Sequence, residues 1–359
     1  MKNKLKIAIL IFLMITFIFN ISLNSYPYFV EKYYSTGINK VTIQALSSFT
    51  GLLPFSLAEF LVFFLLGILI MLFVLMLISI KKRRFKQSFL NFFAYVSLLY
   101  ILFMFLWGFN YDRLSFDKIS GLQVRESSKQ ELYLLCEDLI KRANFLREKL
   151  DENSKGIMVI RGGYKDVFKR AEKGYDTVAN LYPELSGKYG PPKRILLSSK
   201  MSYTGITGIY IPYTGEANVN INITDMMLPA TAAHEMAHQR GFAREDEANY
   251  IAYFTCSMHP DADFQYSGVM LALIYSMNAL AGSDMEGYKA LKTNYSTGVR
   301  NDLIYDKEFW AKYEGKTQEI SDNINNTYLK SNGQTDGVKS YGRMVDLLLA
   351  EYRELFPRQ

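Results

Sequence analysis

The segment Thr231–Gly241 holds the residues best suited to chemistry in this chain of 359 residues. It reads TAAHEMAHQRG, with His234 and His238 four positions apart and Glu235 directly after the first histidine. Residues four apart share one face of a helix, so both imidazoles can reach the same metal ion. The chain has only three histidines, and two of them fall in this pattern, which argues against a chance match. The spacing predicts a zinc site with Glu235 as general base.

An acidic side chain is the expected third ligand, because a catalytic zinc is usually held by three protein ligands and one water. The segment Arg244–Tyr250 begins the next predicted helix and holds Glu245 and Asn249 four positions apart, on one face. Glu247 in the same segment is the alternative ligand. His259 lies about four helical turns beyond Glu245 and beside a proline, so we expect it to face away from the metal.

This order of residues resembles the gluzincin peptidases, in which a glutamate follows the H-E-x-x-H helix in an E-x-x-A-N or E-x-x-A-D run. The resemblance implies one Zn²⁺ per chain, with Glu245 as third ligand and Asn249 as a partner that steadies a ligating histidine. Metzincins fit less well, because the position of their third histidine is Arg244 here, and a guanidinium cannot bind zinc.

The elements next to the motif follow from local patterns. The metal-binding helix is expected to include residues 230–240, to begin near Asp225 and to end at Gly241. A strand is predicted at 218–224, where asparagines alternate with valine and isoleucine. An extended peptide could add to this strand as to a sheet edge, although a strand with one solvated polar face explains the alternation equally well.

The remainder of the C-terminal half is expected to be mostly helical. Together with a small sheet this gives an α+β fold, and the resemblance implies a zincin-like domain over residues 112–359. Helices are predicted at 125–152, 164–185, 244–259, 263–280, 285–295, 307–328 and 338–355, and further strands at 157–160, 194–198 and 208–212.

Residues 1–111 are predicted to form a membrane domain. Three apolar segments without charged side chains, at about 7–26, 60–80 and 89–109, are long enough to cross a bilayer core of about 30 Å. The first is interpreted as an uncleaved anchor, because its apolar core is long and no A-x-A cleavage site follows it. The stretch 41–53 between the first two crossings is either an amphipathic helix at the membrane surface or an ordinary packed loop.

Positive charge predicts the orientation. Lysines at positions 2, 4 and 6 and the basic run 81–86 mark the cytoplasmic side, so the N-terminus is expected in the cytoplasm and residues 112–359 outside it. These clusters exceed the formal net charge of +6, and the rest of the chain is near balance, so no nucleic-acid partner is expected. Cys136 and Cys256 are the only cysteines, and the sequence leaves open whether they pair.

The whole chain resembles the bacterial membrane family called domain of unknown function 3810. The resemblance covers the three crossings, the segment Tyr213–Asn218, the H-E-x-x-H-x-x-G-F-A-R-E block and the segment Ser340–Asp346. It implies a zinc-peptidase-like domain without an established substrate. By this resemblance alone, Tyr341 and Arg343 are candidates for stabilising the oxyanion of the reaction.

The sequence therefore predicts a membrane-anchored zinc metallopeptidase that acts on a peptide or protein substrate. The alternative is a zinc-binding membrane sensor or receptor without proteolytic turnover. A structural membrane protein with a degenerate site is disfavoured, because a scaffold has no need of all three residues His234, Glu235 and His238.

Overall fold

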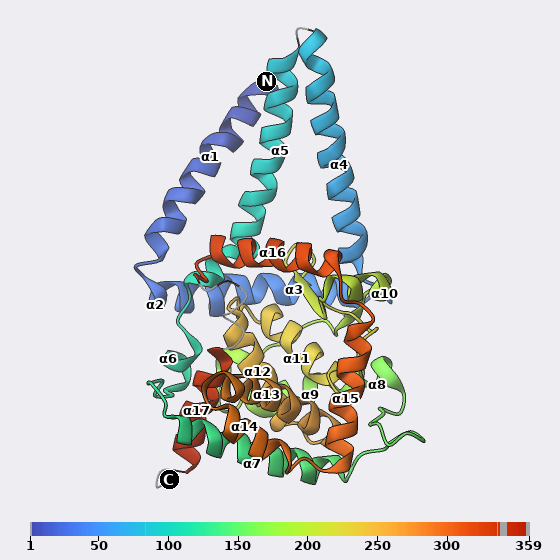
Figure 1. The fold of residues 1–359 in the computed structure, drawn as a ribbon. Coiled ribbons are helices and arrows are strands. Elements are labelled where there is room, and N and C mark those ends of the chain that lie inside the picture. The colour runs from blue at the N-terminus through green and yellow to red at the C-terminus, as the bar shows by residue number, and fades with distance from the viewer. Residues whose placement is uncertain (1, 83, 336, 338–342, 357–359) are drawn as a thin grey trace.

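A computed structural model describes residues 2–82, 84–335, 337 and 343–356 of the chain. The described part is mainly helical and includes one small sheet of three strands. Three long helices converge at one end of the molecule and spread apart toward a helical body at the other end (Figure 1). The predicted combination of many helices with a small sheet is confirmed.

The three long helices are α1 (Lys2–Leu23), α4 (Leu57–Ser79) and α5 (Phe85–Leu106), each long and apolar enough to cross a membrane. They lie within a few residues of the predicted crossings. The Lys6 ammonium donates a hydrogen bond to Asn91 near the start of α5. The N-terminus and the turn between α4 and α5 consequently share one end of the molecule (Figure 1), as the two basic clusters predicted.

The segment between α1 and α4 packs on the helical body. It contains α2 (Pro27–Phe29), a π-helical segment η1 (Val30–Asn39) and α3 (Lys40–Gly51). Of the two alternatives for the stretch 41–53, a helix or a packed loop, the structure has a helix over most of it. One face of α3 is buried through Ile43, Ser47 and Thr50, whose hydroxyl donates to the carbonyl of Thr214 at 3.1 Å.

The helical body begins with a 3₁₀ turn directly after α5 and continues to residue 355. Its helical elements are η3 (Gly108–Asp112), α6 (Phe116–Ser120), α7 (Lys129–Arg147), α8 (Gly163–Arg170), α9 (Glu172–Val178), η4 (Pro183–Leu185), α10 (Ser198–Met201), η5 (Ser202–Thr204), α11 (Leu228–Gln239), α12 (Glu245–Ser257), α13 (Ala262–Ser283), α14 (Met285–Lys292), α15 (Thr297–Ala311), α16 (Lys316–Ser331) and α17 (Met344–Leu355). A short 3₁₀ turn, η2 (Ile80–Lys82), follows α4.

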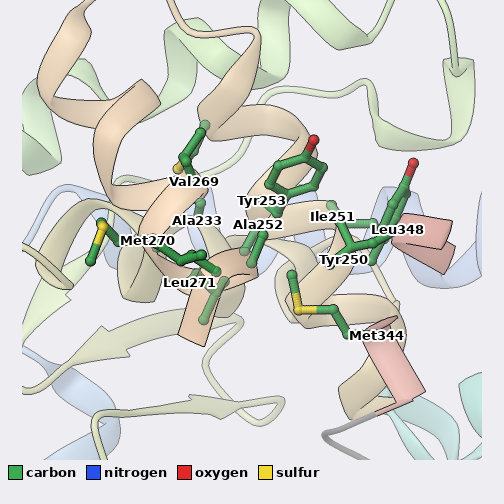
Figure 2. Packing of buried hydrophobic residues seen from close by; sticks show 14 of the residues in the cluster. Ala233, Tyr250, Ile251, Ala252, Tyr253, Val269, Met270, Leu271, Met344 and Leu348 are labelled. Carbon is green, nitrogen blue, oxygen red and sulfur yellow. The ribbon is translucent and has the colours of Figure 1, made fainter. Parts of the chain in front are cut away.

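The core of this body lies where α11, α12, α13 and α17 meet. Figure 2 shows apolar side chains of these four helices packed together, including Ala233, Ile251, Val269, Met344 and Leu348, all of which are buried. Burial of apolar area at roughly 25 cal/mol per Å² makes this cluster the main stabilising contribution around the histidine helix. The helix with the H-E-x-x-H segment is consequently held in place by the helices packed around it.

The sheet differs from the prediction at its most important strand. Its order is β1 (Lys193–Arg194), β3 (Glu216–Val219), β2 (Gly208–Ile211), with β1 parallel and β2 antiparallel to β3. The strand expected at 218–224 is wrong in its bounds and in its position at an edge, because β3 ends at Val219 and is paired on both sides. The alternating asparagines have another role: Asn220 donates to Ser202 at 3.1 Å, and its Oδ1 accepts from the Asn222 amide at 2.9 Å, which forms a turn.

Other bounds changed for local reasons. The helix expected from 125 begins at Lys129, because Ser128 and Glu131 form a capping box. The strand expected at 157–160 is only a single bridge between Glu152 and Met158. The expected helix 164–185 is divided into α8, α9 and η4.

Candidate metal centre

Helices α11 and α12 bring three potential metal ligands together. His234 and His238 lie one turn apart on α11, and Glu245 is the first residue of α12. Glu245 Oε2 lies 3.2 Å from Nε2 of His234 and 3.5 Å from Nε2 of His238. One ligand atom from each of the three residues falls within 4.8 Å of the others. The sequence had left Glu245 and Glu247 open, and it is Glu245 that the structure places beside the histidines.

The turn between the two helices determines this arrangement. Gly241, with φ of 83°, ends α11 in the left-handed conformation that favours glycine, as predicted. A Cβ at this position would lie 3.1 Å from Oδ1 of Asn110, so the close packing also favours glycine. His238 Nδ1 is 2.7 Å from the carbonyl oxygen of Phe242 in the same turn. As donor of that hydrogen bond, Nδ1 carries the proton and leaves Nε2 free to ligate.

The donor set and its spacing fit zinc. Two imidazole nitrogens and one carboxylate oxygen are a common ligand set of catalytic zinc, with bonds of about 2.0–2.2 Å. Tetrahedral geometry at those lengths separates neighbouring ligand atoms by roughly 3.4 Å. The two nitrogen–oxygen distances of 3.2 and 3.5 Å agree with that separation. The residues present therefore fit the expected ion.

Asn249 lies in α12 one turn beyond Glu245 and interacts with the His234 ring. Burial lowers the pKa of His234, whereas Glu245 and Asn249 act in the opposite direction. Tyr275 on α13 also interacts with Asn249, and burial raises the pKa of this tyrosine to about 12. Asn249 thus lies near both a partly buried tyrosine and a candidate ligand, and its role in steadying that histidine stays a prediction.

Glu235 lies against the edge strand β2. A Cβ at Gly208 would lie 2.6 Å from Cγ and 2.7 Å from Cδ of Glu235, so only glycine fits at this position. Glu235 Oε2 is buried and has no hydrogen-bond partner among the described residues. Burial raises the pKa of Glu235 to about 8. Sequence reasoning missed Gly208, although a glycine inside a predicted strand is a signal of close approach by another group.

The charges of the cluster compensate one another. Burial acts to raise the pKa of Glu245. The His238 and His234 imidazoles have a larger effect in the opposite direction and hold that pKa well below its usual range. Burial acts to lower the pKa of His238. The negative charge and hydrogen bond of Glu245 have a larger effect and raise that pKa to about 9. The carboxylate is thus ionised and faces both imidazoles, as a metal ligand must be.

The other predicted residues lie apart from the three ligands. Glu247 is buried and accepts hydrogen bonds at 2.9 Å from the Phe116 amide and from Nε of Arg244, so its carboxylate fixes the start of α6. Arg343 lies 3.4 Å from the Asp246 carboxylate. Tyr341 is outside the described residues.

The remaining histidine and the cysteines are structural. His259 Nε2 lies 3.0 Å from the carbonyl oxygen of Arg170, and its ring stacks on Phe264 at 3.8 Å, away from the ligands as expected. Cys136 and Cys256 are both buried free thiols. The two cysteines therefore do not pair, a point that the sequence left open.

An aromatic group covers the metal centre on the side of the long helices. The Trp107 ring, directly after α5, lies 5.5 Å from the His238 ring and 4.8 Å from that of Tyr210 in β2. Trp107 Nε1 donates to the Tyr328 hydroxyl of α16 at 3.2 Å, and the Tyr111 and Tyr328 hydroxyls lie 3.0 Å apart. Burial, with a contribution from Glu245, raises the pKa values of both tyrosines. Neither Trp107 nor Tyr111 is among the site residues predicted from the sequence.

Comparison with known proteins identifies a family and nothing closer. A family model described as a protein of unknown function, DUF3810, matches residues 34–349. No curated protein and no solved structure matches the chain. The match extends from η1 to α17 and includes both helices of the metal centre.

Proposed function

The chain belongs to the DUF3810 family, and since that family has no assigned function, we propose from the site itself that the protein is a membrane-anchored zinc-dependent peptidase with a zincin-like domain. One observation carries the proposal: His234, His238 and Glu245 converge at zinc-binding distances while Glu235 lies beside them against an edge strand. This arrangement places potential metal ligands, a base and a strand edge close together.

A zinc ion bound here would supply the Lewis acidity that ionises a water near neutral pH and polarises a carbonyl. In its ionised form, Glu235 is the residue that accepts the water's proton and returns it to the leaving amine. Its free Oε2 is the atom available for that transfer. The hydrogen bond to the Phe242 carbonyl oxygen fixes the orientation of the His238 ring. The buried helices packed around α11 hold that helix in place beside the proposed substrate strand.

The open edge of β2 is the proposed substrate-binding strand. Because β3 is paired on both sides, an extended peptide can add only to β1 or β2, and β2 holds Gly208 against Glu235. Backbone hydrogen bonds along β2 would place a peptide carbonyl near the three ligands. This replaces the earlier assignment of the edge to residues 218–224.

Tyr111 and Tyr328 are the proposed stabilisers of the oxyanion. Their hydroxyls share a hydrogen bond, and both are close enough to Glu245 for its charge to raise their pKa values in addition to burial. A phenol that stays protonated remains a donor for developing negative charge. Tyr328→Phe should reduce kcat by about 10²-fold without loss of zinc.

The membrane placement follows from charge and topology. The basic N-terminus and the turn between α4 and α5 lie at one end, and the helical body at the other (Figure 1). We assign the first end to the cytoplasm and the body to the outer side.

A zinc-binding sensor is the second candidate. The contact between Trp107 and His238 favours it, because a change at the metal could act on α5 through one ring. A sensor would bind zinc without turning over peptide.

The test uses the full chain in lipid nanodiscs, because residues 27–56 pack on the helical body and a fragment beginning at 112 would lack them. Zinc content is measured by mass spectrometry, and cleavage is followed with a mixed peptide library. We expect about one zinc per chain, cleavage by the wild type, zinc without cleavage in Glu235→Gln, and neither in His238→Ala.

Glu247→Gln is the matched control for Glu235→Gln, since it also removes a buried carboxylate from the same pair of helices. It should retain both zinc and cleavage. Cleavage by Glu235→Gln at the wild-type rate would refute the assigned base. Stoichiometric zinc with no cleavage by any form of the protein would favour the sensor.

A further inference from the structure

The metal centre lies immediately next to the end of a membrane-spanning helix. Trp107 follows the last residue of α5, and its ring contacts the ring of the ligand His238 at 5.5 Å. The zinc position is therefore on the order of 10 Å from the end of α5, which is about three residues of extended chain.

The sheet beside the metal centre is attached to the membrane helices. The Tyr213 hydroxyl, in the turn between β2 and β3, donates at 3.0 Å to the carbonyl of Leu99, two turns inside α5. The Glu216 carboxylate of β3 accepts from the amides of Leu57 and Ala58, at the start of α4, at 3.2 and 2.6 Å. These hydrogen bonds attach the sheet with the proposed substrate-binding strand to the ends of α4 and α5 nearest the helical body.

Helix α16 lies between the segment that precedes β2 and Trp107, whose ring packs on β2. Near its start, the Gln318 side chain lies 3.3 Å from the position of a Cβ at Gly205, three residues before β2. Near its end, Tyr328 contacts Trp107, whose ring lies on Tyr210 in β2. The helical span from Gln318 to Tyr328 is about 15 Å, close to the roughly 16 Å of extended chain from Gly205 to Tyr210. The helix therefore forms a wall along the proposed binding strand.

One side of α16 has two exposed isoleucines in its first half and contacts α5 in its second half. Ile320 and Ile324 are 60% and 66% exposed, and Tyr328, four residues further on the same side, packs on Phe103 of α5 with ring centroids 6.5 Å apart. The helix lies across the foot of the three long helices (Figure 1). Exposed apolar side chains next to a membrane-spanning helix are suited to contact with the lipid surface around that helix.

We propose that the substrate is a membrane-anchored polypeptide, cleaved within about five residues of the bilayer, with α16 as the bilayer-facing wall beside β2. This inference rests on the proposed peptidase function and adds the class of substrate. A peptide that leaves the bilayer beside α5 enters between α16 and β2 and reaches Glu235 without an extended spacer.

The substrate test uses full-length protein in nanodiscs and one cleavable sequence in three forms. The first is soluble, the second is joined directly to a transmembrane anchor, and the third is joined to the same anchor through a 40-residue Gly/Ser linker, which spans on the order of 35 Å. The two anchored forms have the same surface concentration, so their comparison reports distance from the bilayer alone. The sequence is chosen by screening the peptide library on short anchors, with Glu235→Gln as the inactive control.

We expect the directly anchored form to have at least a tenfold higher kcat/KM than the form with the long linker. Equal or faster cleavage of the long-linker form would overturn the substrate assignment and leave the peptidase function intact. Absence of any cleavage that depends on Glu235 would overturn both.

The placement of α16 is tested without turnover. A fluorophore is attached at Ile324→Cys, and quenching by lipids labelled near the headgroup is compared with that at the exposed neighbour Asn323→Cys. Strong lipid quenching at 324 and weak quenching at 323 are expected. Equal quenching at both positions would contradict the proposed wall. In the same way, Ile324→Asp should reduce the ratio of anchored to soluble cleavage about tenfold, whereas Asn323→Asp should leave it unchanged.

Discussion

Gly208→Ala adds one methyl group beside the proposed general base. Its Cβ would lie 2.6 Å from Cγ of Glu235, where ordinary van der Waals contact begins at 3.4 Å. The Glu235 side chain must therefore shift by roughly 0.8 Å or more, since β2 is held by its pairing with β3. A misplacement of about 1 Å in a catalytic group can cost about 10²-fold in rate. This corresponds to about 2.7 kcal/mol in the activation free energy.

The assay for Gly208→Ala is kcat/KM on a cleaved library peptide, with zinc content and thermal unfolding measured on the same sample. We expect a loss of about 100-fold in kcat/KM, zinc near one per chain and destabilisation of about 1–3 kcal/mol from overpacking. Gly282→Ala in α13 is the control, because nothing lies within 4 Å of its added Cβ. Wild-type kcat/KM in Gly208→Ala, together with an inactive Glu235→Gln, would refute the contact as a determinant of catalysis.

Three further predictions concern the supports of the site. Asn249→Ala should weaken zinc binding by about 10–100-fold through loss of its interaction with His234, and Asn249→Asp should preserve binding, both measured by competition with a chelator. Glu31→Gln should destabilise the detergent-solubilised protein by about 3–5 kcal/mol in denaturant unfolding, because it leaves Arg113, whose side chain is 1% exposed, without its charge partner; an unchanged midpoint would contradict this. Burial raises the pKa of Glu351 to about 7, so the folded state keeps this proton to higher pH than the unfolded chain. Stability should therefore fall by up to about 3 kcal/mol as pH rises from about 4 to 7, and Glu351→Gln should remove that dependence in unfolding measured at pH 5 and pH 8.

The two histidines and Glu235 could be predicted because their geometry is local. A helix places positions 234 and 238 on one side in any fold, and Gly241 ends that helix by its own conformational freedom. Only a short turn separates His238 from Glu245, so the sequence left Glu245 and Glu247 both open as the candidate third ligand. The choice between Glu245 and Glu247 needed the structure, because both lie in the first turn of α12 and the packing of α6 decides which one faces the metal.

The alternation at 218–224 shows where local pattern misleads. Asparagine side chains that bond to nearby backbone and hydroxyl groups produce the same spacing as a strand with one polar face. Residues 216–219 form the strand, and its central position depends on pairing with segments up to 25 residues away.

The sequence by itself determined the three apolar helices, the helical nature of the C-terminal half and the placement of His234 and His238 on one side of a helix, because each depends on hydrophobic length or on spacing within one helix. The tertiary structure alone decided that Gly208 lies against Glu235, that Trp107 lies against His238 and that Tyr328 of α16 lies against Trp107. These contacts join residues that are 27 to 221 positions apart in the chain. Such contacts form only when distant elements pack, and no local pattern of residue types encodes them.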